Sequence, residues 1–565
     1  MKVHIFSLKM LSLLLIICLL ISVPVTFAAD EEDLPEDDGE NIIDIEEQRN
    51  NEQDQLEIVF NEKVDAETRT LNLVVDESKV ISHPTADWYG INDGTVGNVL
   101  GTENAYYEKD GRGPDGLKMN MEMVNSIKNF KGTVSVVRYG GTFSNYADWK
   151  KAAYSDWAER QPYTAMYWDT DYEDAESDAL SIVDFCKTFL AVNKDMKFHI
   201  VVNMITDTEI DVADLAEFLQ GDGVINHNGG ENWAQRRISM GIKEPIKNIT
   251  YELGNEIEWS TNAKRRDWTK ENYVAVARRF IAAIRSVNED AHISAITPCA
   301  VWSRLGDEWM EWHRYVLMEI GDQIDTLDYH AYNAYRQGYV AAGTVESLAD
   351  DIKQVTGSNR IKIFQSESGS SSNTGTRYGY KSLAFGINLT DYYYRLINLP
   401  GDVFEGATWH SLTNYFRDVN KPEKDDWALT MQQWDGSYIN VPFGEARDFL
   451  SRYGVGDALY MELDDFNFEK PSWVSGAVVK QGDKINVMLT NLSDVNNYNI
   501  SMKFNNKYKL VHSYVMTAPK LTSVVWRTKN EVEIKEMDYS LSKPIDSFLL
   551  QSKSMVCLQL EPIEQ

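Results

Sequence analysis

Short apolar runs alternate with amphipathic segments between about residues 81 and 455. In the segment from Tyr273 to Val287, apolar residues recur every three or four positions, which is the spacing of one face of a helix. Alternation of strands and helices predicts a parallel sheet covered by helices. The clearest strand-like runs are Trp88–Asn92, Phe198–Asn203, Ile293–Ile296 and Thr326–His330.

The spacing of the strand ends favours a closed barrel over an open sheet. Glu256 and Glu367 are 111 residues apart, which is three units of 37, and His330 precedes Glu367 by 37. Trp409 follows 42 residues after Glu367. Each interval suits a strand–helix unit of roughly 30 residues or more. No Gly-x-Gly-x-x-Gly or phosphate loop follows a strand, so we expect an α/β fold with a (β/α)8 TIM barrel over residues 81–455.

The pattern changes after a helix-like segment from Phe443 to Tyr453. Apolar residues then alternate with a period of two, which indicates strands, and turns such as Gln481–Asp483 separate them. We therefore expect a C-terminal β-sandwich over residues 456–565. Residues 56–80, with the strand-like run Leu71–Val75, are expected to join it. The alternating sets are Ile485, Val487 and Leu489; Ile500, Met502 and Phe504; and Val556, Leu558 and Leu560.

The N-terminal residues resemble targeting and linking segments. Residues 1–28 combine Lys2 and Lys9 with an apolar run and small residues at a cleavage position, which predicts a signal peptide and a secreted, extracellular chain. Residues 29–55 contain 13 acidic residues and a single basic one, Arg49, so we expect a disordered acidic spacer. Without Cys18, the remaining cysteines are Cys186, Cys299 and Cys557, which form neither a disulfide framework nor a metal-binding spacing.

The formal net charge of −32 argues against nucleic acid or an anionic membrane as a partner. It is compatible with a neutral polymer. Two isolated glutamates suggest the chemistry: Glu256 ends the run Tyr251–Asn255, and Glu367 follows the run Ile361–Ser366. Hydrolysis of a glycosidic bond needs one carboxylic acid to protonate the leaving oxygen and one carboxylate to attack or stabilise the sugar carbon.

Several motifs, in order, resemble glycoside hydrolase family 51, whose members are mainly α-L-arabinofuranosidases with some endoglucanases. The family lies in clan A, which comprises retaining (β/α)8-barrel enzymes. The resemblance spans roughly residues 68 to 560. It rests on Arg138–Phe143 with Tyr146 and Trp149, Val202–Asn203, Asp211–Glu217, Glu252–Glu256, Asp328–Tyr332 and Ser366–Glu367.

By position, the resemblance implies that Glu256 is the acid/base and Glu367 the nucleophile. Glu252, which precedes the loop, and Glu258, which lies beyond it, are the competing carboxylates. Asn255 matches the residue that hydrogen-bonds the sugar 2-hydroxyl, and Arg138 would keep Glu367 ionised. The remaining expected substrate contacts are Asn203; His330, which positions the acid or a sugar hydroxyl; Tyr332, which donates to Glu367; and Trp409, as a sugar-stacking residue, a site floor or ordinary core.

The chain departs from the family pattern at three places. Tyr139 replaces the proline before Gly-Gly, and Asn92 and Asp93 stand where the first strand commonly ends on a sugar-binding glutamate. The 65 residues from Arg138 to Asn203 suggest an enlarged loop, rich in aromatic residues. All three departures lie where substrate would bind. The aromatic residues of the loop are Trp157, Tyr163, Tyr167 and Trp168.

These observations predict double displacement on a plant or algal polysaccharide, with arabinofuranosyl side chains as the first expectation. The two carboxyl groups should lie about 5–5.5 Å apart. Glu256 should have its pKa raised by Glu367 and by burial, so that alkaline loss of activity tracks Glu256. No metal or cofactor is implied. The alternatives are an endo-β-glycanase of the same clan and a non-catalytic carbohydrate-binding barrel.

Overall fold

The computed structural model describes residues 68–93, 121–145, 148–153, 182–258, 268–298, 308–370, 381–412, 428–433, 437–526 and 529–563. The expected signal peptide, the acidic spacer and the aromatic loop around Trp157 and Trp168 lie outside these ranges. Within the described ranges, no helix combines the length and the apolar character needed to cross a bilayer.

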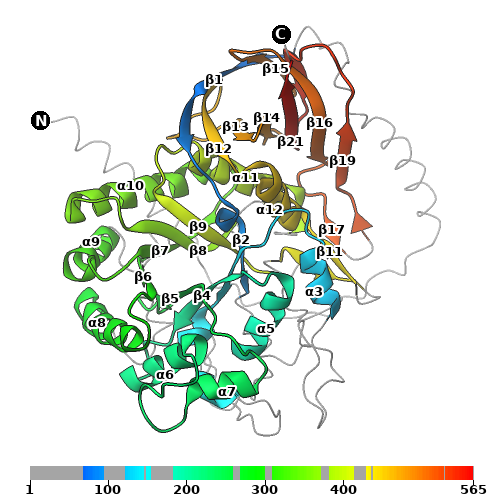
Figure 1. Cartoon of the computed structure of the whole chain (residues 1–565). Coiled ribbons are helices and arrows are strands. Elements are labelled where there is room, and N and C mark those ends of the chain that lie inside the picture. Colours follow the sequence, from blue (N-terminus) through cyan, green and yellow to red (C-terminus); the bar gives the residue numbers. More distant parts are fainter. Residues whose placement is uncertain are drawn as a thin grey trace, which may run out of the picture. The chain divides into compact units, whose positions relative to one another are not determined.

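Eight parallel strands close into a barrel, in chain order, and helices surround them (Figure 1). The first strand pairs with the last, Ile91 opposite Trp409, which closes the ring. The strands are β2 (Gly90–Asp93), β3 (Val136–Tyr139), β4 (Lys197–Val202), β5 (Ile249–Leu253), β6 (His292–Ile296), β7 (Thr326–Asn333), β8 (Lys362–Ser370) and β9 (Phe404–His410).

Capping residues mark the ends of two barrel helices, α6 and α10. Thr208 and Asp211 form a capping box at the start of α6, and Gly357, with φ of 70°, ends α10. The helices are α3 (Met121–Lys128), α4 (Trp149–Ala152), α5 (Ile182–Val192), α6 (Glu209–Gln220), α7 (Trp233–Ser239), α8 (Lys270–Val287), α9 (Trp309–Ile320), α10 (Gly338–Thr356), α11 (Leu383–Ile397) and α12 (Pro442–Tyr453), with the 3-10 helices η1 (Ala86–Tyr89) and η4 (Thr142–Asn145).

The expected first barrel strand, Trp88–Asn92, is wrong at its start. Trp88 and Tyr89 lie in η1, and β2 begins only at Gly90. The Thr85 side chain accepts a hydrogen bond from the backbone of Asp87 at 3.3 Å, which stabilises the turn in place of an extended strand. A Cβ at position 90 would lie 2.3 Å from Val136 Cγ1, so glycine is needed where β2 enters the barrel.

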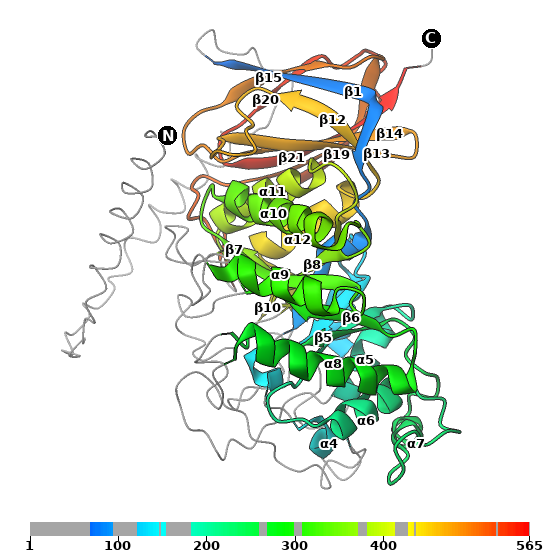
Figure 2. The same cartoon turned by 90° about the vertical axis from the view of Figure 1, so that its left-hand side faces the viewer.

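A nine-stranded sheet forms the second part of the described chain and curls on itself (Figures 1 and 2). The N-terminal strand β1 lies inside this sheet, antiparallel to β12 and parallel to β15. Its strands are β1 (Thr70–Ser82), β12 (Asp457–Leu463), β13 (Val474–Gln481), β14 (Lys484–Asn491), β15 (Tyr498–Lys503), β16 (Tyr508–Thr517), β19 (Glu533–Asp538), β20 (Ser547–Leu550) and β21 (Ser554–Pro562); the hairpins β10 (Thr430–Gln432)–β11 (Tyr438–Asn440) and β17 (Val525–Trp526)–β18 (Lys529–Asn530) accompany it.

The curled sheet packs on helix α11 of the barrel. The hydroxyls of Thr390 and Thr490 lie 2.7 Å apart, and Asn398 donates to the carbonyl of Gly476 at 2.9 Å. Both contacts are buried, so the sheet supports the side of the barrel formed by α11. The fold class expected from the sequence, a (β/α)8 barrel with a C-terminal β-sandwich, is thereby confirmed.

Candidate active site

Charged and polar side chains converge at the C-terminal ends of the barrel strands, where the loops of such barrels place their chemistry. They come from five strands, β3, β5, β7, β8 and β9, or from the turns that follow them, although 272 residues separate Arg138 from His410 in the chain. The group consists of Arg138 on β3, Glu252 and Glu256 on and after β5, His330 and Tyr332 on β7, Glu367 on β8 and His410 on β9.

The turn that carries Glu256 has a special backbone. Gly254 has φ of 85° and Glu256 has φ of 45°, which is uncommon for a residue with a side chain. Asn145 holds the turn from both sides: its Nδ2 donates to the carbonyl of Asn255 at 2.6 Å, and its Oδ1 accepts from the Asn255 backbone at 3.0 Å. Such conformations persist where the surroundings over-determine them, often at functional sites.

A register irregularity sets the position of Glu367. Tyr329 on β7 is opposite Gln365 on β8, but the next residue, His330, is opposite Glu367, so Ser366 is the extra residue of a bulge. Bulges redirect side chains and are common beside active sites. Here the bulge aligns Glu367 with His330.

Glu367 accepts two short hydrogen bonds. Arg138 Nη1 donates to its Oε1 at 2.8 Å, and the Tyr332 hydroxyl donates to its Oε2 at 2.5 Å. Burial alone would raise the pKa of the Glu367 carboxyl. The charge of His330, the His410 ring, the Arg138 guanidinium and the Tyr332 hydrogen bond outweigh burial, and the pKa lies well below its usual value. Glu367 is therefore held ionised.

Arg138 binds a second carboxylate more extensively than the first. Its Nε and Nη2 donate to Glu252 at 2.6 and 2.7 Å, and Nη2 also donates to Asn255 Oδ1 at 2.7 Å. All of these side chains are buried. Burial lowers the pKa of Arg138, but Glu252 and Glu367 raise it above its usual value, so the guanidinium stays charged.

Glu256 is the more accessible member of the candidate catalytic pair. Its side chain is 22% exposed, against 9% for that of Glu367. One carboxylate oxygen of each, and a ring nitrogen of His330, lie within 4.8 Å of one another. A leaving group that approaches from solvent would therefore meet Glu256 first.

His330 lies between the two glutamates. Its Nδ1 is 2.7 Å from Glu256 Oε1 and 3.5 Å from Glu367 Oε2. Burial lowers the pKa of the ring, but Glu367 and Glu256 raise it to about 9. The sequence suggested that His330 positions the acid, and its hydrogen bond to Glu256 places it to do so.

Asn255 places a free donor in the site. Its Oδ1 accepts from Arg138, while its Nδ2 has no hydrogen-bond partner among the residues that the structure describes. An unpaired buried donor is costly, by about 1–3 kcal/mol. A bound acceptor such as a sugar hydroxyl would relieve that cost.

Sequence reasoning missed His410. Its ring is edge-on to Tyr332, with centroids 6.3 Å apart, and Asn92 Nδ2 lies 3.0 Å from its Nδ1. Asn92 thus reaches the site through His410, whereas the side chain of Asp93 lies outside the described part. Successive side chains of a strand point to opposite faces. An outward direction for Trp409 therefore predicts that the next residue, His410, points into the barrel, and this was the signal that could have identified it.

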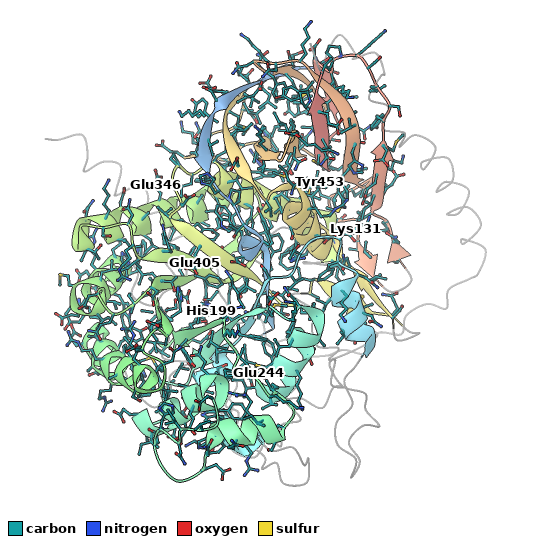
Figure 3. The ribbon with its side chains drawn as sticks, viewed as in Figure 1. Lys131, His199, Glu244, Glu346, Glu405 and Tyr453 are labelled. Carbon is teal, nitrogen blue, oxygen red and sulfur yellow. The ribbon has the colours of Figure 1, made fainter. Side chains whose placement is uncertain are left out.

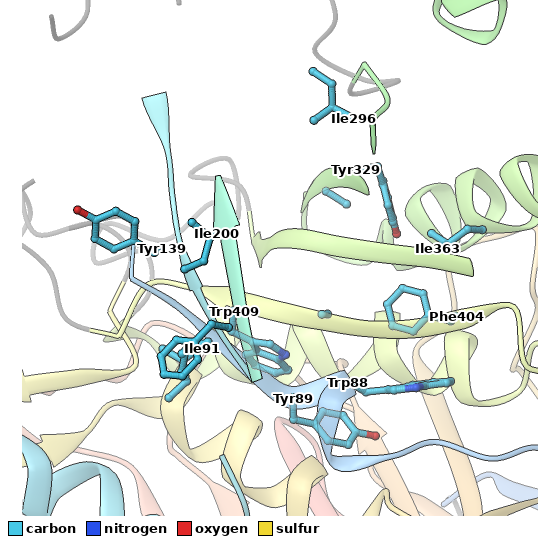
Figure 4. Packing of buried hydrophobic residues seen from close by; sticks show 14 of the residues in the cluster. Trp88, Tyr89, Ile91, Tyr139, Ile200, Ile296, Tyr329, Ile363, Phe404 and Trp409 are labelled. Atoms are coloured by element: carbon cyan, nitrogen blue, oxygen red, sulfur yellow. The ribbon is translucent and has the colours of Figure 1, made fainter. Parts of the chain in front are cut away.

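Two expected substrate contacts, Trp409 and Asn203, make contacts within the protein. Trp409 is fully buried and belongs to the hydrophobic core (Figure 4). Its ring packs outside the barrel strands on Tyr393 and Phe443, with ring centroids 4.9 and 5.1 Å away. The three interpretations of Trp409 were sugar stacking, a floor of the site and core packing. The structure shows core packing, and the sugar-stacking interpretation is wrong. Asn203 organises its own loop: its Nδ2 donates to Thr206 Oγ1 at 2.6 Å, and its Oδ1 accepts from the backbones of Ile205 and Thr206.

A second charged layer lies beneath Arg138. His199 on β4 lies inside the barrel (Figure 3). Its Nε2 is 2.7 Å from Asp328 Oδ2 and 3.3 Å from Glu252 Oε2, and the ring of Phe364 stacks on it with centroids 4.3 Å apart. Burial lowers the pKa of His199 to about 4 and raises that of Asp328 to about 7. This layer fills the barrel with polar groups below the site, and its contacts could not be predicted from the sequence because they join residues far apart in the chain.

Neither cluster of acidic and histidine side chains in the described barrel is assigned to a metal. In the lower cluster, Arg138 occupies both oxygens of Glu252, and His199 is hydrogen-bonded to Asp328. In the upper cluster, Arg138 and Tyr332 already donate to Glu367, and Glu256 is hydrogen-bonded to His330 Nδ1. The donor set suits proton transfer between Glu256, His330 and Glu367 and nucleophilic attack by Glu367.

No protein-family model matches the chain. It is similar to two proteins named intracellular exo-α-(1→5)-L-arabinofuranosidase. The protein from Acetivibrio thermocellus is 25% identical over 247 residues, 43% of this chain and 44% of the relative. The one from Halalkalibacterium halodurans is 25% identical over 287 residues, 50% of this chain and 53% of the relative. The chain thus spans about half the length of the curated relatives it matches.

The fold has solved counterparts. The crystal structure of an α-L-arabinofuranosidase from Thermotoga maritima, solved as an arabinose complex, covers 87% of this chain and 100% of its own, with a TM-score of 0.70 and 17% identity. At that identity the likeness establishes the fold. The resemblance seen in the motifs is therefore accompanied by distant sequence similarity over up to 50% of the chain and by a similar fold over 87% of it.

Proposed function

We propose that this chain, being similar to family 51 arabinofuranosidases in sequence and fold, is a retaining glycoside hydrolase that releases arabinofuranosyl groups. The main support is one arrangement: Glu256 and Glu367 present carboxylate oxygens within 4.8 Å of each other at the C-terminal end of the barrel. Carboxyl groups about 5–5.5 Å apart are typical of retaining enzymes, whereas inverting enzymes hold theirs about 6.5–9.5 Å apart.

In the first step, Glu367 attacks the anomeric carbon while the carboxyl group of Glu256 passes a proton to the departing glycosidic oxygen. The bond from carbon to that oxygen breaks with its electron pair, and a covalent ester forms on Glu367. Arg138 and Tyr332 support the attack because they favour the ionised form of Glu367. In the second step, Glu256 takes a proton from water, which attacks the same carbon and releases Glu367.

We further propose a neutral plant or algal polysaccharide as the substrate and an extracellular site of action. The acidic charge of the chain and the signal-like residues 1–28 support these two points. The relatives' names describe intracellular, exo-acting enzymes for α-(1→5)-linked arabinose. For this chain we propose the same sugar, arabinose. Cell fractionation with an antibody against the barrel would test the proposed extracellular location.

Hydrolysis of aryl glycosides tests the activity. Wild-type protein should cleave aryl α-L-arabinofuranoside faster than the xyloside or glucoside, and Glu367→Ala should lose this activity. Glu462→Ala is a matched control, because Glu462 is an exposed carboxylate on β12 whose recorded contact is the Tyr460 hydroxyl. Cleavage of internal bonds in a β-glucan, without arabinofuranoside cleavage, would favour the endo-β-glycanase. Binding of polysaccharide without any cleavage would favour the non-catalytic barrel.

A further inference from the structure

The position of His330 Nδ1 determines where a proton resides in the resting site. The nitrogen faces Glu256 Oε1 at 2.7 Å and Glu367 Oε2 at 3.5 Å. The ionised Glu367 carboxylate only accepts hydrogen bonds, so a hydrogen on Nδ1 suits the contacts with both glutamates. The ring is buried, and solvent offers little competition for that contact.

The other charges around the ring favour an additional proton on it. Glu252, Glu256 and Glu367 approach from β5, its following turn and β8, and Arg138 on β3 is their shared cation. Arg138 donates two hydrogen bonds to Glu252, one to Glu367 and one to Asn255. A protonated His330 places a positive charge 2.7 Å from Glu256 Oε1.

The remaining polar groups near the ring do not replace that cation. On β7 itself, Tyr332 donates its hydroxyl to Glu367, and Asp328, whose pKa is raised by burial to about 7, adds negative charge when ionised. On β9, burial lowers the pKa of His410, which favours its neutral form. The same balance raises the pKa of His330 to about 9.

We propose that His330 stores the proton that Glu256 delivers to the leaving oxygen, so that the resting site contains ionised Glu256, protonated His330 and ionised Glu367. This inference rests on the proposed function. His330 acts through Glu256 and is a positioning residue, because Glu256 is the group that touches the leaving oxygen.

The proton balances through both steps. In the first, the Nδ1 proton moves to Glu256 Oε1 and on to the glycosidic oxygen, while Glu367 forms its ester bond and loses its negative charge. His330 is then neutral, since its strongest electrostatic support, Glu367, has gone. In the second step, the proton of the attacking water passes through Glu256 back to Nδ1, as Glu367 regains its charge.

The proposal revises one sequence-based expectation. The sequence predicts that alkaline loss of activity tracks Glu256, but a proton shared by Glu256 and His330 across 2.7 Å titrates as a property of the pair. Because the pKa of His330 is raised, the reactive form exists below that value and is lost as the pH rises through about 9.

Titration of the ring by nuclear magnetic resonance tests the proposal without any substrate. In wild-type protein labelled with ¹⁵N-histidine, the signal absent from His330→Asn should titrate near pH 9. In Glu367→Gln and in Glu256→Gln the midpoint should fall by about one pH unit or more. His313, which pairs with Asp351 at 2.7 Å on α9 and α10, is the matched control and should not move. A wild-type midpoint at or below about 6.5, the ordinary histidine value, would overturn the proposal.

The dependence on the leaving group supplies a second test. His330→Asn should slow cleavage of aryl glycosides with poor leaving groups by about 10²–10⁴-fold and leave those with strongly acidic leaving groups nearly unchanged, as for loss of general acid catalysis. Equal slowing of both kinds would show a purely structural role and contradict the proposal. If wild-type protein cleaves no glycoside but the ring titrates near pH 9, the proposed function fails while the shared proton stands.

Discussion

Arg138 and Glu252 form a two-point ion pair in the buried interior of the barrel. Nε and Nη2 of the guanidinium lie 2.6 and 2.7 Å from the two carboxylate oxygens, and both side chains are fully buried. This geometry fixes the plane of the guanidinium and directs Nη1 at Glu367. The pair therefore orients the cation that keeps the proposed nucleophile ionised.

Replacing Arg138 with methionine should destabilise the protein and shift its acidic limit of activity. The change leaves the carboxylates of Glu252 and Glu367 buried without their cation, and breaking such a pair costs about 3–5 kcal/mol. The pKa of Glu367 should rise, because the lowering charge has gone, so kcat/KM should fall at a higher pH than in wild type. Urea unfolding and a pH–rate profile measure the two effects.

The double variant Arg138→Met with Glu252→Leu separates the effect on stability from the effect on the acidic limit of activity. Removal of both charges should recover much of the free energy of unfolding, because a buried pair can be replaced by apolar groups at little cost. The acidic limit should stay shifted, since Glu367 still lacks its guanidinium. Recovery of both properties together would contradict the role given to Arg138.

The stability of the folded protein should depend on His330 in a defined pH window. The pKa of His330 is raised from about 6.5 to about 9, so its contribution is fully present below pH 6.5 and is lost as the pH rises to about 9. The difference in unfolding free energy between wild type and His330→Asn should shrink by on the order of 3 kcal/mol across that window. Burial lowers the pKa of His313, so the corresponding difference for His313→Asn should change below pH 6.5 instead.

Replacing Asn255 with alanine should slow catalysis because its Nδ2 donor is free to bind a sugar hydroxyl. Hydrogen bonds that strengthen in the transition state contribute several kcal/mol, so kcat should fall by about 10²–10³-fold. The effect should nearly vanish with a substrate that lacks the 2-hydroxyl, for which wild type is already slow. The same loss on both substrates would indicate instead that Asn255 supports the turn held by Asn145.

Replacing Trp409 with phenylalanine should reduce stability and leave substrate affinity unchanged. Its ring packs on Tyr393 and Phe443 in the core, where a Trp→Ala change costs about 3–5 kcal/mol and the smaller change to phenylalanine a part of that. Trp473→Phe is the control, since Trp473 is 39% exposed and should shift stability by about 0.5 kcal/mol or less. A raised KM in Trp409→Phe, with unchanged unfolding, would favour sugar stacking after all.

The sequence predicted the barrel and its two central glutamates because both are local signals. Strands buried on both faces, such as β4, appear as largely apolar runs, and Glu256 and Glu367 follow two such runs. The regular interval between strand ends then located both glutamates on one face. These inferences needed no knowledge of long-range pairing.

Long-range choices were beyond the sequence. Nothing local indicates that Arg138 binds Glu252, 114 residues away, or that His199 pairs with Asp328. The bulge at Ser366, which aligns Glu367 with His330, arises from sheet register. The position of Trp409 at a strand end predicts that it contributes to the site. Its side chain instead points into the core, and His410 is the residue that faces the site.

The stereochemistry of the first product tests the central claim most directly. We would follow cleavage of an aryl α-L-arabinofuranoside by proton magnetic resonance and observe the anomeric signal before the released sugar equilibrates. Attack by Glu367 and then by water inverts the anomeric carbon twice, so the α-anomer should appear first. Initial release of the β-anomer would mean a single displacement by water and would contradict a covalent role for Glu367.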